Sequence, residues 1–441
     1  MSLNHPIQPI GLICLLWCSC QVCFVHAQDI PDPNPRPNPD GTFTWWVGND
    51  LQYPSIQEVI DAAFPGDEIA IAEGQYVEDL ILSQDDLTIR PFCVLDAGVA
   101  KWANVVLWNP TKGFEDDPWS IKVENSLGCY IGRPRQFFQL SNGFQAPSVV
   151  DPGEWNPQAE PIDVVTVTEN SDGIALTFWS RDDESVSIYA RAGTPTFHSC
   201  LIRSQAGFGS AILVTGDKAS PSFIDCTINN FFVDGGTLDG NPIQPITITA
   251  DASEDVRARF HDCTITECVA GATGVVLQVG ARTFWDGSRI VNNQSTLSDG
   301  IIVVARGSAD FSGCTFSQNL ARFGTVRTIH SESPGSDEEV IFQSCDFLDN
   351  QTVDGQYGGV VSSIGVTGSF PPVELSGCGI DGNNGHAGLN FFDIDTPFFP
   401  SFRLGSDLSD VSVLVECSAD LNGDGVVDGT DLVHLLSQWT I

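Results

Sequence analysis

A short apolar pattern recurs along the second half of the chain. Each copy has Phe or Leu, a cysteine three positions later and an aliphatic or aromatic residue two positions after that. The copies begin at Phe197, Phe223, Phe260, Phe311, Phe342 and Leu375, and their cysteines are Cys200, Cys226, Cys263, Cys314, Cys345 and Cys378. A degenerate copy, Phe284-Trp-Asp-Gly287, lies between the third and the fourth. One copy occupies about 30 residues, a period typical of stacked-repeat proteins.

A second apolar run, opened by glycine and rich in β-branched residues, precedes most copies. These runs begin at Gly209, Gly274, Gly300, Gly324 and Gly359. Such residues suit strands that fill a narrow interior with one face and pair with strands above and below. Turn-forming residues stand between the aromatic residue and the cysteine, where a sharp bend into another sheet is expected: Ser199, Asp225, Asp262, Gly313, Ser344 and Gly377. We therefore predict an all-β solenoid of stacked parallel coils.

Equivalent positions of successive coils should form columns along the axis, about 4.8 Å apart. For the cysteines we favour a column of small buried side chains, since Cys is among the most buried residue types. Disulfides between adjacent coils remain open as an alternative, because this spacing is near the lower limit for a bridge. A metal site or a reactive thiol is disfavoured by the lack of paired Cys and His. Polar residues four or five positions after the cysteine predict an amide ladder at a corner: Gln205, Asn230, Asn319, Asn350 and Asn383.

The segment from Ser55 to Arg90 predicts the start of the solenoid. Apolar residues at helical spacing between Ile56 and Ala63 predict a short helix that ends at Pro65-Gly66, and short strands separated by Gly and Asp follow. This arrangement resembles the N-terminal cap and first coils of the pectin-lyase-like right-handed β-helix superfamily, in which a helix plugs the open end of the coil. The resemblance implies a right-handed parallel β-helix with an N-terminal cap helix, and says little about activity.

The N-terminus predicts export. An apolar stretch ends in Val25-His26-Ala27, a small-residue cleavage site, although no Lys or Arg precedes the stretch. We expect a signal peptide at 1–27, a Pro-rich linker at 28–43, the β-helix at 44–405 and a small module at 406–441. No later segment is apolar enough to span a membrane, so the mature chain should have no membrane span and should be secreted or displayed at the cell surface. The four cysteines of the signal stretch would be removed, which leaves ten of 14.

The charge balance narrows the function classes. The chain has 57 acidic and 19 basic residues and a formal net charge of −38. Such a surface repels nucleic-acid phosphates and anionic lipids, so we exclude nucleic acid as a partner. An excess of carboxylates suits a protein outside the cell, where calcium is abundant.

A calcium-binding loop is expected near the C-terminus. In the stretch from Asp420 to Asp431, oxygen ligands stand at loop positions 1, 3, 5 and 12, and a glycine stands at position 6, as in an EF-hand. The predicted Ca²⁺ ligands are Asp420, Asn422, Asp424, Val426 through its carbonyl, Asp428 and Asp431. With Asp431 in place of the usual Glu and a following helix, the loop resembles the dockerin type I calcium repeat. Dockerins resemble paired loops that bind a cohesin partner, so a single loop makes a cohesin-like partner doubtful and favours anchoring or capping of the last coil.

No group of residues establishes a catalytic site. The stretch Gly385-His386-Ala387-Gly388 only loosely resembles a polygalacturonase motif, and the acidic run at 181–184 is typical of a solvated loop. His198 and His261 occupy equivalent outward positions two coils apart and are expected at the surface. We therefore favour a secreted, calcium-binding solenoid that binds polysaccharide or a cell-surface component, with Trp179, Trp285 and Phe231 as candidate contact aromatics. The alternatives are a polysaccharide lyase, esterase or glycosidase, and a structural envelope component.

Overall fold

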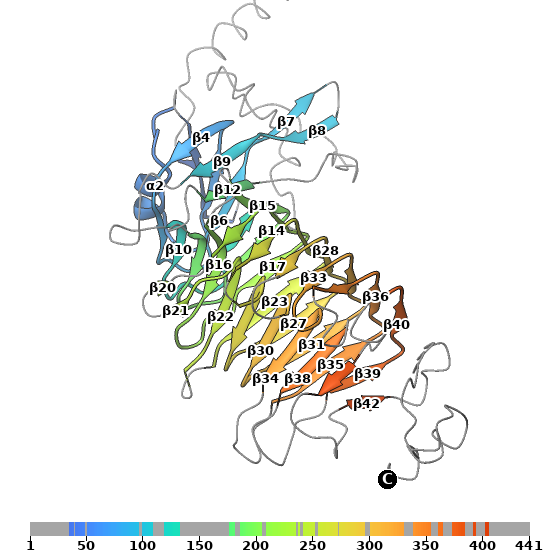
Figure 1. Cartoon of the computed structure of the whole chain (residues 1–441). Coiled ribbons are helices and arrows are strands. Elements are labelled where there is room, and N and C mark those ends of the chain that lie inside the picture. Colours follow the sequence, from blue (N-terminus) through green and yellow to red (C-terminus); the bar gives the residue numbers. More distant parts are fainter. Residues whose placement is uncertain are drawn as a thin grey trace, which may run out of the picture.

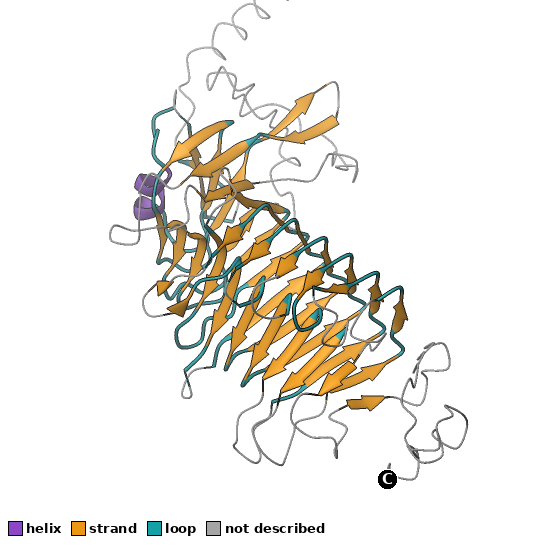
Figure 2. Cartoon of the chain, viewed as in Figure 1, coloured by secondary structure: helices purple, strands orange, loops and turns teal. Residues whose placement is uncertain are grey.

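The chain folds into short strands wound along one axis (Figures 1 and 2). The computed structural model describes residues 35–38, 40–48, 51–96, 99–108, 119–132, 176–180, 186–204, 209–234, 237–238, 241–251, 255–271, 273–295, 300–329, 338–353, 360–364, 373–383, 391–393 and 402–404. In this part of the chain, stacked parallel sheets form the parallel β-helix that the repeat predicts. The right-handed sense of winding stays a prediction.

Three long sheets form the walls. Sheet A has 13 strands, in the order β1 (Arg36–Pro37), β2 (Phe43–Val47), β3 (Glu68–Ile71), β6 (Thr88–Pro91), β11 (Tyr130–Gly132), β14 (Thr196–His198), β17 (Ser222–Ile224), β23 (Arg257–His261), β27 (Arg282–Asp286), β31 (Ser308–Ser312), β35 (Val340–Gln343), β39 (Val373–Ser376) and β42 (Phe402–Leu404). Sheet B has ten, in the order β4 (Gly74–Val77), β9 (Val105–Trp108), β12 (Leu176–Ser180), β15 (Cys200–Ser204), β18 (Thr227–Asn229), β24 (Thr264–Thr266), β28 (Arg289–Val291), β32 (Thr315–Ser317), β36 (Asp346–Leu348) and β40 (Gly379–Asp381).

Sheet C closes the coil. Its ten strands are β5 (Leu80–Leu82), β10 (Trp119–Val123), β13 (Val186–Ala190), β16 (Ser210–Val214), β22 (Ile246–Thr249), β26 (Val276–Val279), β30 (Ile302–Ala305), β34 (Val326–Ile329), β38 (Val361–Ile364) and β41 (Phe391–Asp393). A five-stranded ladder continues from sheet B, with β19 (Phe232–Val233), β25 (Val269–Ala270), β29 (Gln294–Ser295), β33 (Leu320–Ala321) and β37 (Gln351–Thr352). Two antiparallel hairpins are additions, β7 (Cys93–Asp96) with β8 (Val99–Trp102) and β20 (Thr237–Leu238) with β21 (Asn241–Pro242).

Two sharp corners bend each regular coil. One residue with positive φ joins sheet A to sheet B, and a second joins sheet B to the five-stranded ladder. The first corner uses Ser199, Asp225, Asp262, Gly287, Gly313, Ser344 and Gly377; the second uses Asn230, Glu267, Asn292, Gln318 and Asp349. Gly382 also has positive φ, at the equivalent position after β40. The left-handed conformation turns the chain within one residue, and Gly, Asn and Asp tolerate it best. The turn-formers predicted before each cysteine are therefore confirmed.

The N-terminal segment contains the expected helix, α2 (Ile56–Ala62). The hydroxyl of Ser55 caps it by accepting from the N–H of Glu58, and the carboxylate of Glu78 accepts from the N–H groups of Ile56 and Gln57. Its buried face packs beside β2, β3 and β5. A role as a plug of the open end stays a prediction. Within the predicted linker at 28–43, Arg36–Pro37 pairs antiparallel with β2. The boundaries of the linker stay a prediction.

A column of aromatic rings fills the interior behind sheet A. Ring centroids of Phe197, Phe223, Phe260, Trp285, Phe311 and Phe342 follow one another at 5.2, 5.0, 3.9, 5.8 and 4.8 Å, nearly parallel. The degenerate copy was therefore placed one residue too early: Trp285 is the partner of Phe260 and occupies the core position, whereas Phe284 is the partner of Arg259. Side chains alternate between the two faces of a strand, so Thr283 and Trp285 both point inward and Phe284 points outward. The indole N–H of Trp285 donates to the hydroxyl of Thr283.

The cysteine column lies next to the aromatic column. Cys129 and Cys268 and the six repeat cysteines are free and buried, as the favoured interpretation predicted. Each repeat thiol lies near carbonyl groups, as where Cys263 donates to the carbonyl of Phe223 in the preceding coil at 3.4 Å. Ser288 replaces the cysteine in the degenerate coil, and its hydroxyl accepts from the N–H of Cys263. Burial raises the pKa of Cys268 to about 12, because the thiolate would lose its hydration.

An asparagine ladder lines the second corner over four coils. The side chains of Asn293, Asn319, Asn350 and Asn383 follow one another, each Nδ2 of the first three donating to the next Oδ1 at 3.2, 2.9 and 2.8 Å. The ladder is confirmed for Asn319, Asn350 and Asn383, and Asn293 extends it. The prediction that Asn230 belongs to the ladder is wrong. Asn230 occupies the corner position with positive φ, and the next residue, Phe231, occupies the position equivalent to the ladder asparagines. Gln205 lies outside the described residues.

Candidate functional site

The outer face of sheet C is largely covered. Tyr189 and Leu213 point away from the solenoid interior, yet they are almost completely buried in a second apolar cluster with Trp119, Val186, Val233 and Ile243. Val233 is the last residue of β19 in the five-stranded ladder, and Ile243 lies in the connection between β21 and β22. Leu277 and Val303 continue the outward column and are also buried. The described part of this face therefore offers little free surface to a ligand.

Sheet A presents an open polar face instead. On β23, Ala258 and Phe260 point inward, so that Arg257, Arg259 and His261 point outward and are exposed. On the neighbouring β27, the same alternation turns Arg282, Phe284 and Asp286 outward. The two strands pair in parallel, which places Arg259 beside Phe284 and His261 beside Asp286. We call these residues, with Asp262 and Asp310, the outer-face cluster.

Two guanidinium groups pack over one aromatic ring in this cluster. The Cζ atoms of Arg259 and Arg282 lie 5.4 and 4.9 Å from the centroid of the Phe284 ring. Arg282 also donates to the carboxylate of Asp310 on β31, at 3.1 Å. A guanidinium over an aromatic face is attracted to the ring's negative face and loses some of its freedom. Two planar donors therefore contact the same ring on the outer face of sheet A, and each guanidinium can bind a carboxylate through two parallel hydrogen bonds.

A histidine lies between two carboxylates beside the guanidiniums. The Nδ1 of His261 is 3.0 Å from Oδ2 of Asp286, and its Nε2 is 3.2 Å from Oδ2 of Asp262. The imidazole side chain is 51% exposed, so a ligand can reach it. Asp262 occupies the left-handed corner directly after β23, which brings its carboxylate beside the imidazole. A carboxylate on Nδ1 fixes the orientation of an imidazole, and such a pair can bind a sugar hydroxyl or transfer a proton.

The histidine prediction is confirmed in its geometry. His198 and His261 lie on β14 and β23, separated by β17, and are therefore two coils apart. His261 is exposed, but His198 is half-buried, with Nδ1 3.1 Å from the hydroxyl of Ser199 and its ring beside Tyr130. His261 has two carboxylates beside its ring nitrogens.

Two of the three predicted contact aromatics are wrong. Trp285 and Phe231 are each only 1% exposed and belong to the core, so they cannot stack on a sugar. Trp179 lies on β12, where the structure does not describe its side chain. The aromatic residue of the open face is Phe284, the neighbour of the one proposed.

The predicted calcium ligands and two weaker candidates lie outside the described residues. These are Asp420, Asn422, Asp424, Val426, Asp428 and Asp431, the stretch around His386, and the acidic run at 181–184. Within the described ranges, no group of three or more His, Cys, Asp or Glu side chains converges as a metal site. The same ranges contain no helix that is both long and apolar enough to cross a membrane.

Sequence reasoning missed Arg259, Arg282, Phe284 and Asp286. The signal was present as two charged, alternating segments, Arg-Ala-Arg-Phe-His and Arg-Thr-Phe-Trp-Asp, whose inward residues are Phe260 and Trp285. Aligning Trp285 with Phe260 turns both sets of charged residues to one face. If Phe284 is aligned with Phe260 instead, the charged residues of the two strands are assigned to opposite faces of the sheet, because a shift of one residue exchanges the two faces of a strand.

Comparisons with known proteins do not assign a family. No family model matches the chain, and no curated protein matches it. Among solved structures, the chain is similar to an alginate lyase from Paenibacillus sp. (TM-score 0.38, 11% identity, 80% of this chain and 97% of that chain covered) and to the pectin methylesterase from Aspergillus niger (0.33, 12%, 73% and 88%). It is also similar to the catalytic unit of a GH87 α-1,3-glucanase from Streptomyces thermodiastaticus (0.33, 12%, 85% and 70%). Likenesses this distant decide neither a reaction nor a ligand.

Proposed function

We propose that this protein is a secreted, calcium-binding β-helix that binds polysaccharide through the outer-face cluster of sheet A. The observation that carries the proposal is the pair Arg259 and Arg282 packed over Phe284, next to the exposed His261 and Asp286. Guanidinium, imidazole and carboxylate groups are the partners that sugar hydroxyl and carboxyl groups use for hydrogen bonds.

The scaffold supports binding because it holds these groups rigidly. Both strands pair in parallel along their whole length with each other, and the rings behind them are stacked at close distance. Side chains on a rigid sheet lose less freedom when a ligand binds, so more of the interaction energy appears as affinity. A repetitive polymer also benefits from a repetitive surface, since neighbouring sugars can contact neighbouring coils.

Secretion and calcium binding rest on the sequence. The apolar N-terminal stretch with its small-residue cleavage site supports export, and the spacing of Asp420, Asn422, Asp424 and Asp431 supports one Ca²⁺ ion. We infer that the C-terminal module anchors the protein or covers the end of the last coil. A cohesin-like partner is the less favoured role, because the stretch from Asp420 to Asp431 resembles a single dockerin repeat, whereas dockerins bind cohesin through paired loops.

Binding is tested by affinity electrophoresis through gels that contain acidic or neutral polysaccharides. The wild-type protein should be retarded by at least one polymer, and Arg259→Ala with His261→Ala should abolish most of the retardation. The matched control is Arg289→Ala, which removes an exposed arginine from β28 on sheet B. Equal retardation of the double variant and the control would contradict the proposed face, and no retardation by any polymer would contradict the function.

A polysaccharide-degrading enzyme is the second candidate, because His261 lies between two carboxylates. The Asp286 carboxylate orients the imidazole through Nδ1, which would leave Nε2 to exchange a proton with a substrate once Asp262 is displaced. Reducing ends and ultraviolet absorbance should be followed together on the same polysaccharides. Reducing ends with new absorbance would indicate a lyase, and reducing ends alone a hydrolase. If His261→Gln leaves any such activity unchanged, the imidazole has no role in it.

A further inference from the structure

The acceptor pattern for N-linked glycans occurs twice in the chain. This pattern is Asn-X-Ser or Asn-X-Thr, where X is any residue except Pro. The two copies are Asn293-Gln294-Ser295 and Asn350-Gln351-Thr352. The stretch Asn109-Pro110-Thr111 has the same spacing, but its central Pro excludes it. In a secreted protein the pattern is expected in a surface loop, where a glycan transferase can reach the asparagine.

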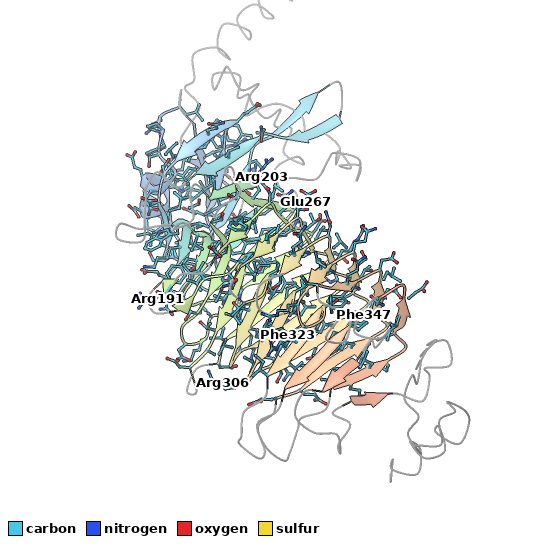
Figure 3. All side chains as sticks on the ribbon, in the orientation of Figure 1. Arg191, Arg203, Glu267, Arg306, Phe323 and Phe347 are labelled. Atoms are coloured by element: carbon cyan, nitrogen blue, oxygen red, sulfur yellow. The ribbon has the colours of Figure 1, made fainter. Side chains whose placement is uncertain are left out.

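The structure places both copies in the wall of the solenoid instead. Asn293 and Asn350 belong to the asparagine ladder, and their relative exposure is 0%. The residues that follow them form the short strands β29 and β37, which pair in parallel with β33 between them. Both copies lie in the coils that run from Glu267 to Phe347, two residues labelled in Figure 3. Neither asparagine is therefore accessible to an enzyme in the folded protein.

Both hydrogens of each acceptor amide are already used in hydrogen bonds. One goes to the next ladder amide, at 3.2 Å from Nδ2 of Asn293 and at 2.8 Å from Nδ2 of Asn350. The other goes, at 2.9 Å in both cases, to a backbone carbonyl of the preceding coil, that of Ile265 or that of Phe316. Each Nδ2 is therefore enclosed by the coil before it and the coil after it.

Transfer of a glycan would replace one of these hydrogens. A bond forms between Nδ2 and the anomeric carbon of a lipid-pyrophosphate-linked sugar, the bond from that carbon to the pyrophosphate oxygen breaks, and one Nδ2 proton is released. The modified amide keeps a single N–H, so either the ladder or the backbone carbonyl loses its donor, and a buried acceptor without a donor is costly. The sugar ring also needs space that the neighbouring coil occupies, because protein interiors are close-packed.

Two structural requirements of a coil together produce the acceptor pattern. The ladder position requires Asn, and the residue two positions later faces the interior in a column of small buried side chains: Ser295, Ala321 and Thr352. Ser295 donates to the carbonyl of Thr273 at 2.8 Å. The intervening coil, Asn319-Leu320-Ala321, meets both requirements without a hydroxyl and is no acceptor. The ladder therefore needs the asparagine but not the hydroxyl that completes the pattern.

From this geometry we propose that Asn293 and Asn350 are glycan acceptors in the unfolded chain only, and that a glycan on either asparagine and the folded β-helix exclude each other. A transferase that meets the chain before these coils close traps it unfolded, whereas one that meets the folded protein finds no acceptor. The inference concerns the order of folding and modification during export, and does not depend on the polysaccharide ligand. The natural export route must therefore let these coils fold before, or away from, N-glycan transfer.

The test secretes the full chain from a eukaryotic host that attaches N-glycans to unfolded chains, with and without an inhibitor of lipid-linked donor synthesis. Mass spectrometry measures the glycan on each asparagine before and after digestion by a protease that removes unfolded chains. The matched variant, Ser295→Ala with Thr352→Ala, removes both acceptor patterns and keeps the ladder asparagines. Circular dichroism melting of wild type and variant made in a bacterium without N-glycan transfer compares their stabilities. The inhibitor arm keeps the wild-type sequence, so it decides the question even if the variant is less stable.

We expect glycans on both asparagines in the undigested wild type and on neither in the protease-resistant fraction. The inhibitor should restore the yield of resistant wild-type protein. A resistant, cooperatively melting chain that carries a glycan on Asn293 or Asn350 overturns the exclusion. Absence of a glycan from both asparagines in the undigested wild type overturns their assignment as acceptors. Polysaccharide binding is measured on protein made in the bacterium, so the proposed function stands or falls separately.

Discussion

Truncation of two neighbouring aromatic residues, Trp285 and Phe284, should lower the stability of the fold to different extents. Trp285 is 1% exposed, lies 3.9 Å from the ring of Phe260 and 5.8 Å from that of Phe311, and donates a hydrogen bond to Thr283. Removing a buried aromatic side chain costs about 3–5 kcal/mol, and the two stacked neighbours lose their shared contact as well. We therefore expect Trp285→Ala to lower the free energy of unfolding by about 4 kcal/mol.

Phe284→Ala is the matched comparison, because it removes a ring from the next position of the same strand. Phe284 is half-buried outside sheet A and packs against Arg259 and Arg282, contacts that are worth about 0.5–1 kcal/mol each at an exposed site. We expect the free energy of unfolding to fall by about 1–2 kcal/mol. The free energy of polysaccharide binding should weaken by more than this. Urea unfolding followed by far-ultraviolet circular dichroism measures both stabilities. A greater loss of stability for Phe284→Ala than for Trp285→Ala would refute the register on which the outer-face cluster depends.

Three further results are expected. Asn319→Ala should cost about 2–5 kcal/mol, since the N–H of Asn293 and the carbonyl of Ile290 lose buried partners, whereas the exposed Gln294→Ala should cost under about 0.5 kcal/mol; urea midpoints compare them. Because burial raises the pKa of Cys268 to about 12, its thiol stays protonated in the fold but ionises in the unfolded chain above about pH 9. Stability should therefore be complete below pH 9 and fall by about 1.4 kcal/mol per pH unit between 9 and 12 through this thiol; a flat profile for wild type against Cys268→Ala would contradict it. Chelation of Ca²⁺ should increase hydrogen exchange only over about the last 25 residues, and uniform loosening of the β-helix would argue against an autonomous calcium module.

The sequence predicted the coils because their signals are local and repeated. An aromatic residue, a turn-former and a cysteine recur at nearly constant spacing, so the alignment of each coil is supported by the alignment of the next. The buried columns that contain Phe260 and Cys263 follow from this alignment. The asparagine ladder was found at Asn319, Asn350 and Asn383 for the same reason. Asn230 was misassigned because the two corner positions differ by one residue, and both favour Asn: one for its left-handed backbone, the other for its hydrogen bonds.

The candidate site was missed because it depends on the register between two coils. In the degenerate coil, serine replaces the cysteine and tryptophan replaces the phenylalanine, so the two strongest markers of alignment are absent. Composition favours Phe284 as the core residue, since phenylalanine fills that position in five other coils. Only the pairing of β23 with β27 shows that Trp285 is inside and that arginine, histidine and aspartate from different coils meet outside.

The coil-by-coil construction of the solenoid makes its length a property that evolution can adjust. Each of these coils pairs only with the coil before it and the coil after it, through strands in register. Duplication of one coil away from the outer-face cluster would lengthen the solenoid by about 4.8 Å and leave every interior column continuous. Duplication between β23 and β27 would instead separate Arg259 from Arg282 and His261 from Asp286. We therefore expect relatives of this protein to vary in coil number outside this pair of strands, and to keep these two coils adjacent.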